Sequence, residues 1–158
     1  MPAFSVATPA ALKDFVGREI AVTDWLVISQ ERIQAFAEAT EDRQWIHLDE
    51  ARAAKESPFK GTIAHGFLTL SLVAHFMQQS LKIESGLRLA VNYGLNRVRF
   101  PSPVRSGSRI RARVAVVSAT DISAEAMELV FSVTVECEGS AKPCCVAEYR
   151  CNYTTDQW

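Results

Sequence analysis

Alternation of apolar and polar residues in the second half of the chain is the feature that most constrains the fold. Between 127 and 137 every odd position is apolar: Met127, Leu129, Phe131, Val133, Val135 and Cys137. Residues 108–116 alternate in the same way, with arginine at 109, 111 and 113. Successive side chains of a strand point to opposite faces, so this pattern predicts an antiparallel sheet with one face on a core and one in water.

The partner for that apolar face is predicted to be a helix. The segment from Thr62 to Leu81 contains no Asp, Glu, Lys or Arg. Its histidines, glutamines and hydroxyl residues make it too polar for a membrane span, so we expect a helix over 64–80 that is buried nearly all round. Further strands are expected at 20–28, 93–100 and 146–153, and helices at 10–16, 30–40 and 49–55. The predicted class is α+β, with an antiparallel sheet wrapped around a long central helix.

Length and charge set the broad class of protein. The 158 residues predict a single domain over 1–158, with a core of about 18–154. Seventeen basic and 18 acidic residues leave a net charge of −1, which favours neither nucleic acid nor a membrane surface as partner. The N-terminus lacks a secretory pattern, and the four cysteines form no CxxC pair. We therefore expect a cytoplasmic protein with reduced thiols and no metal site.

Two short features could carry chemistry. Asp42 and His47 lie five residues apart in a polar segment, and a carboxylate beside an imidazole can hold a water and move its proton. Gly66 lies near the predicted start of the central helix, where an N–H without an internal partner suits a developing oxyanion. Taken singly, each is more often structural. Together they are what addition of water to an enoyl thioester requires.

The residues around both features resemble a known family. FAEATEDRQWIHLDEARA followed by FKGTIAHGFLTLSL is similar to the MaoC-like, or NodN-like, (R)-specific enoyl-CoA hydratases and dehydratases. The motif's aspartate falls on Asp42, its histidine on His47 and the glycine of its HG pair on Gly66. Gln44-Trp45 stands where the motif usually has Asn-Pro, a departure that leaves the local shape of the pocket open and that we do not interpret as loss of activity.

This resemblance implies a hot-dog fold and a homodimer with its site near the interface. It also implies a hydro-lyase that interconverts trans-2-enoyl-CoA and (R)-3-hydroxyacyl-CoA. Asp42 and His47 would be the acid/base pair and the Gly66 N–H the oxyanion donor. Coenzyme A, or an acyl-carrier protein, would enter as part of the thioester substrate, and no other cofactor is expected.

Several residues and the overall function allow more than one interpretation. Candidate substrate-binding residues are Trp45, His65, Phe67, Tyr93 and Asn96, for which core packing or structural hydrogen bonds are the alternative. The arginines at 97, 99, 105, 109, 111 and 113 could bind coenzyme A phosphates, or could form a solvated strand face balanced by glutamates. The alternatives to a hydratase are a hot-dog acyl-CoA thioesterase and a non-catalytic module that binds acyl thioesters.

Overall fold

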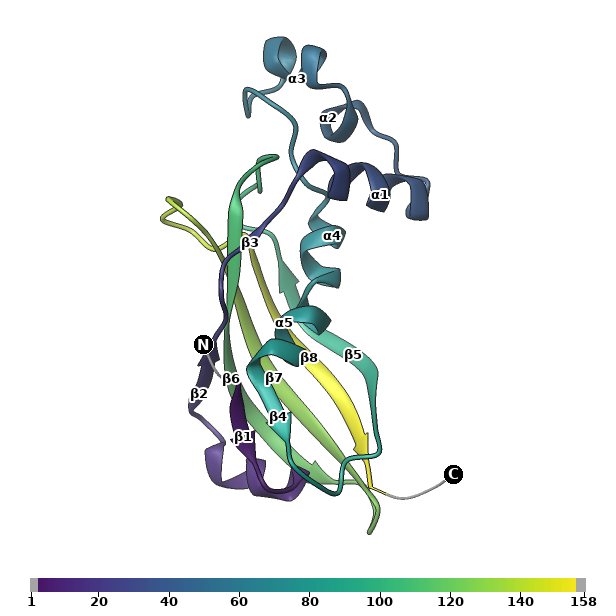
Figure 1. The fold of residues 1–158 in the computed structure, drawn as a ribbon, viewed down its shortest axis with the longest axis vertical. Coiled ribbons are helices and arrows are strands. Elements are labelled where there is room, and N and C mark those ends of the chain that lie inside the picture. Colours follow the sequence, from purple (N-terminus) through teal and green to yellow (C-terminus); the bar gives the residue numbers. More distant parts are fainter. Residues whose placement is uncertain (1–2, 156–158) are drawn as a thin grey trace.

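Six antiparallel strands form the main sheet of the computed structural model, which describes residues 3–155. The order across the sheet is β2-β6-β7-β8-β5, and β3 follows β2 along the same edge of β6. The bounds are β2 (Glu19–Val22), β3 (Leu26–Val27), β5 (Leu89–Arg99), β6 (Arg109–Asp121), β7 (Ala126–Cys137) and β8 (Cys145–Thr154). The long strands twist and curve around the two central helices (Figure 1).

The predicted alternation is confirmed in β6 and β7. Ile110, Ala112 and Val114 are fully buried on β6, and the six apolar residues predicted to face inward on β7 are all buried. Across the outer face, the β6 arginines pair with glutamates: Arg109 with Glu138 and Arg111 with Glu136. The four cysteines are free and buried, as expected of reduced thiols.

The central helix differs from its prediction. It is two helices, α4 (Gly66–Ser71) and α5 (Val73–Ser80), separated at Leu72, and it starts at Gly66 rather than at 64. It is also not buried all round, because Phe67 is 67% exposed and Gln78 and Gln79 face solvent. The buried side, with Phe76 and Val73, packs on the concave face of the sheet. Within residues 3–155, no helix has both the length and the apolar character needed to cross a membrane.

Three short helices precede the central pair. They are α1 (Gln30–Thr40), α2 (Trp45–Leu48) and α3 (Glu50–Glu56), which project together beyond one end of the sheet (Figure 1). Ser29 caps α1 by accepting the Arg32 N–H at 3.3 Å. The α2 turn was not predicted.

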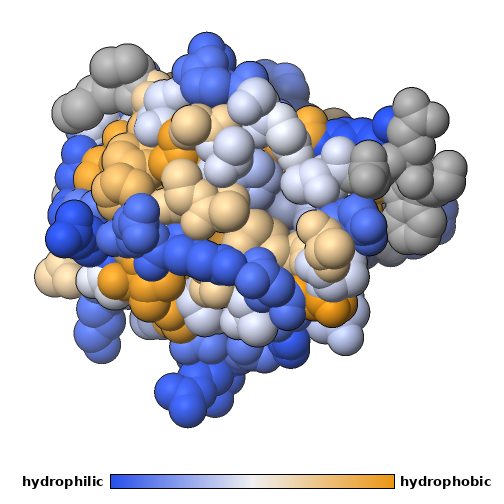
Figure 2. Space-filling view, turned by 90° about the horizontal axis from the view of Figure 1, so that it is seen from below, coloured by the Kyte–Doolittle hydropathy of each residue, from blue (hydrophilic) through white to orange (hydrophobic). Residues whose placement is uncertain are grey.

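The remaining elements lie at the other end of the molecule. A 3-10 helix, η1 (Pro9–Phe15), replaces the helix expected over 10–16, and β1 (Phe4–Val6) pairs in parallel with β4 (Leu81–Ile83). The prediction of one strand over 20–28 is wrong at its centre, where the chain is divided into β2 and β3. At this point the Thr23 hydroxyl accepts the Ala112 N–H at 2.9 Å. Apolar and polar side chains are interleaved over this end (Figure 2).

Candidate active site

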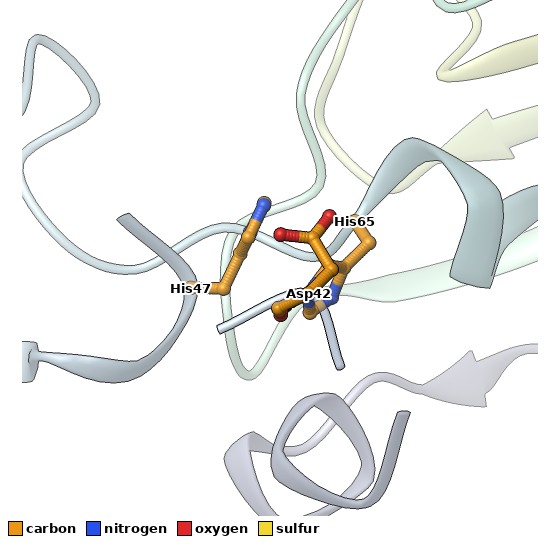
Figure 3. A group of neighbouring side chains, drawn as sticks. All are labelled: Asp42, His47 and His65. Carbon is orange, nitrogen blue, oxygen red and sulfur yellow. The ribbon is translucent and has the colours of Figure 1, made fainter. Parts of the chain in front are cut away.

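Three segments that are separate in the sequence meet where α1–α3 join the central helix. Asp42 lies in the loop between α1 and α2, His47 lies on α2, and His65 is the N-cap residue of α4. Each contributes a side-chain oxygen or nitrogen that lies within 4.8 Å of those of the other two. The three side chains point toward one another (Figure 3). The motif pair, Asp42 and His47, is thus brought together, and His65 joins it.

Backbone carbonyls decide which nitrogen of each imidazole carries a proton. Nδ1 of His47 lies 2.7 Å from the Ile63 carbonyl oxygen, and Nε2 of His65 lies 2.9 Å from the Asp42 carbonyl oxygen. A carbonyl can only accept, so each of these nitrogens donates. In neutral His47 the lone pair is therefore on Nε2, the nitrogen needed for a base.

The surroundings of His47 favour its neutral form. His47 is buried, and this burial lowers its pKa below the ordinary 6.5. The bond to the Ile63 carbonyl raises the pKa, the neighbouring His65 lowers it, and Asp42 raises it by charge attraction. Burial is the largest of these effects, so the lone pair on Nε2 is available at neutral pH.

A hydrogen-bond chain that the sequence did not indicate fixes the α2 turn. Gln30, the first residue of α1, donates from Nε2 to the His47 carbonyl at 2.7 Å. Its Oε1 accepts the Thr62 hydroxyl at 2.6 Å, and Thr62 is buried. Gln30 thereby joins α1, α2 and the 62–66 segment. Its side chain is one of many polar groups in the sequence, and no spacing marks it.

Gly66 follows His65 directly and is the first residue of α4, so its N–H has no acceptor within the helix. A Cβ placed on Gly66 would lie 3.1–3.2 Å from the Phe100 ring. Phe100 in turn meets Phe67 edge-on, with ring centroids 6.1 Å apart. Both phenyl rings are exposed. Ile63, Gly66 and Phe100 also help to line a hollow of about 320 Å³ beside Gly66.

Three other predicted substrate-binding residues have partners away from this cluster. Trp45 lies under the Arg52 guanidinium, 4.2 Å from the ring centroid. The Arg150 guanidinium lies over the ring of Tyr93, on β5, 5.0 Å from the ring centroid. Asn96 donates to Glu148 on β8 at 3.2 Å. The structure therefore gives each a packing or cross-strand contact, and a role in substrate binding stays a prediction.

The basic stretch divides into two groups. Arg109, Arg111 and Arg113 pair with glutamates on the sheet, which matches the solvated-face alternative. Within residues 3–155, Arg97, Arg99 and Arg105 have no acidic partner. They lie on β5 and on the following segment, which runs beside the 62–66 segment: the Ala64 N–H donates to the Val104 carbonyl at 2.7 Å.

Two imidazoles and a carboxylate are also a donor set that a divalent transition metal can use. A metal requires ring lone pairs that converge on one point. The His47 and His65 rings are instead stacked, with centroids 3.7 Å apart and planes at 25°, so their lone pairs lie in two nearly parallel planes and do not converge on one point. The arrangement suits proton transfer better than coordination.

Comparison with known proteins decides the family. A profile described as "MaoC like domain" matches residues 12–137. The chain belongs to the MaoC-like family. It is 49% identical over 144 residues to a Mycobacterium tuberculosis protein named 3-hydroxyacyl-thioester dehydratase Z, covering 91% of this chain and 92% of that one. It is 42% identical over 134 residues to nodulation protein N of Rhizobium leguminosarum bv. viciae, covering 85% and 83%.

The hot-dog fold predicted for this chain is also confirmed. The R-hydratase of Pseudomonas aeruginosa, in its unliganded form, superposes with a TM-score of 0.70 at 24% identity, covering 95% of this chain and 87% of that one. The protein has the α+β hot-dog fold, with its sheet around the central helices. Membership of a dehydratase family supports a hydro-lyase.

Proposed function

We propose that the protein catalyses the reversible addition of water to a trans-2-enoyl-CoA to give the (R)-3-hydroxyacyl-CoA. The observation that carries this is the pairing of Asp42 with a buried His47 whose Nε2 bears the lone pair. The relative named a 3-hydroxyacyl-thioester dehydratase supports the same substrate class.

In the proposed reaction, one water lies between the Asp42 carboxylate and Nε2 of His47. As its oxygen adds to Cβ of the enoyl group, the water gives a proton to His47 and the thioester becomes an enolate. The Gly66 N–H donates to the enolate oxygen. The acid/base pair then returns a proton to Cα, so one water is added overall and the side chains regain their starting states.

Coenzyme A is the carrier that the charges favour. Arg105 lies beside the 62–66 segment, and Arg97 and Arg99 lie on β5, which precedes Arg105 in the chain. None of the three has an acidic partner in the described part of the chain, and guanidinium groups suit phosphates. Arg97 also has φ of 46°, at a bulge in β5 between Asn96 and Arg99, a left-handed conformation uncommon outside glycine. We propose that these arginines bind the phosphates of coenzyme A.

Truncated substrates test this assignment. Replacing Arg99 by Ala is expected to raise KM for crotonyl-CoA about tenfold and to leave KM for a crotonyl N-acetylcysteamine thioester, which lacks phosphates, unchanged. Arg109→Ala, which removes a sheet arginine already paired with Glu138, is the matched control and should change neither. Equal effects on both thioesters would exclude a phosphate contact.

We further propose that two copies assemble through β5. This strand ends the sheet, so one of its edges is unpaired, and its apolar residues Leu89, Val91 and Leu95 are exposed. Pairing β5 antiparallel with its copy satisfies both edges around a two-fold axis. Asp42 is also exposed in the single chain, and a second copy that covers the site would exclude bulk water.

Product analysis tests the reaction. Purified protein is mixed with crotonyl-CoA, loss of the conjugated thioester absorbance is followed, and the product is resolved on a chiral column. (R)-3-hydroxybutyryl-CoA is the expected product. An (S) product would contradict the assignment of the site, and release of free CoA thiol from a saturated acyl-CoA would favour the thioesterase. Tight acyl-CoA binding without turnover would favour the non-catalytic module.

A further inference from the structure

His65 contacts every part of the candidate site, although it is not one of the two motif residues. It is buried, with 2% of its surface exposed. Its Nε2–H donates to the Asp42 carbonyl, its ring stacks on His47, and it is followed directly by Gly66 at the start of α4. Phe36 of α1 packs against the ring from another side, with centroids 5.0 Å apart.

The hydrogen bond from His65 to the Asp42 carbonyl anchors the loop of residues 41–44, which makes few other contacts by hydrogen bond. Residues 41–44 are neither helix nor strand. Their other bonds stay within the loop and its flanking helices, as from the Arg43 side chain to Glu38 and Glu41. Among the described residues, His65 alone ties the Asp42 backbone to the central-helix segment. Removing the donor therefore frees the loop that carries the carboxylate.

The stack restrains the second member of the pair. The His47 ring is fixed at one edge by Nδ1 donating to the Ile63 carbonyl, and a single bond leaves it free to tilt about that edge. The stacked His65 ring, with its centroid 3.7 Å away, covers one face and restricts this tilt. Nε2 of His47 then keeps its direction toward the Asp42 side of the site (Figure 3).

We propose that His65 is the positioning residue of this site: through its Nε2–H and its ring it sets the Asp42 carboxylate against Nε2 of His47. This inference rests on the proposed function and adds to it a residue that acts through the acid/base pair. In neutral His65, Nδ1 is left with a lone pair that is buried and has no hydrogen-bond partner in residues 3–155. Among the described residues, the imidazole is thus held by one hydrogen bond, to the Asp42 carbonyl, and by its ring contacts.

Two variants separate positioning from simple packing. His65→Phe keeps a ring that can stack but has no donor, and His65→Gln keeps an amide N–H near the position of Nε2. We expect His65→Phe to lower kcat by about 10–100-fold with KM changed less than about threefold, since small displacements of reacting groups cost this much. His65→Gln is expected to recover at least about tenfold of that loss. The matched control is His75→Phe on α5, whose histidine also has a buried unpartnered nitrogen and an aromatic neighbour, and it should leave kcat unchanged.

A second readout does not depend on turnover. The chain has three histidines, so the His47 ring can be titrated by NMR. The titratable groups that act on His47 are His65 and Asp42; α1 presents the neutral Gln30, and the 62–66 segment a carbonyl. Removing His65 in His65→Gln takes away an influence that lowers the His47 pKa, so the pKa is expected to rise.

The outcomes are distinct. Wild-type protein without hydratase activity, but with the His47 titration moved as expected, would contradict the proposed function and leave the contact between the rings supported. An active wild type whose His65→Phe variant keeps full kcat would overturn the positioning role. Equal losses of kcat in His65→Phe and His65→Gln, together with an unmoved His47 titration, would show that His65 is a packing residue only.

Discussion

At the scale of single residues, one backbone carbonyl determines how His47 can act. The Ile63 oxygen holds the proton on Nδ1 and so leaves the lone pair on Nε2, where the proposed base needs it. Burial lowers the His47 pKa below 6.5, and the proposed base can accept a proton only when neutral. We therefore predict that kcat/KM for the enoyl thioester rises with pH along an acidic limb whose midpoint lies below 6.5. A pH–rate profile of the wild-type enzyme measures this, and a midpoint above that value would contradict it.

The same pKa shift predicts a pH-dependent stability. Because the pKa of His47 is lower in the folded state, the unfolded state binds more protons at acidic pH. Stability is therefore lost as pH falls from the ordinary histidine pKa through the folded-state value. Urea denaturation of wild type and His47→Gln over this range should show a shallower dependence in the variant. Parallel curves would mean that His47 does not titrate with a lowered pKa.

At the scale of elements, the α2 turn depends on its neighbours for its position. It is four residues long, and its N-cap residue Gln44 makes no capping bond. Gln30→Leu removes the donor to the His47 carbonyl and the acceptor of the buried Thr62 hydroxyl. We predict a loss of about 1–3 kcal/mol in the free energy of unfolding, measured by urea denaturation. Gln34→Leu is the control on the same helix, because within residues 3–155 the Gln34 side chain bonds only to the exposed Glu38. An equal loss there would contradict the assignment.

Element length explains which elements could be predicted from the sequence. The strands β6 and β7 are long enough for alternation to show, and Ser29 marks the start of α1. β1 and β4 have three residues each, too few for a period. The break at Leu72 carries no glycine or proline to signal it. The motif predicted Asp42 and His47 as a pair, and the structure brings their side chains together. The stacked His65 and the bonds of Gln30 depend on contacts between distant segments.

At the scale of the whole molecule, the open edge of β5 predicts a dimer. Replacing Val91 by Lys puts a charge into the exposed apolar row of this strand. We predict that this variant elutes as a monomer in light-scattering chromatography, whereas wild type elutes as a dimer. Val117→Lys, at an exposed position of β6, is the control and should leave the mass unchanged. A dimeric Val91→Lys protein, or a monomeric wild type, would contradict assembly through β5.

The central claim is that Asp42 and His47 perform the proton transfers of hydration. Its most direct test is the turnover of crotonyl-CoA by Asp42→Asn and His47→Gln, with circular dichroism and thermal melting to verify the fold. Loss of the base or of its carboxylate partner should lower kcat at least ~10²-fold in each variant while the fold survives. Near-normal turnover by either folded variant would contradict the assignment of the acid/base pair.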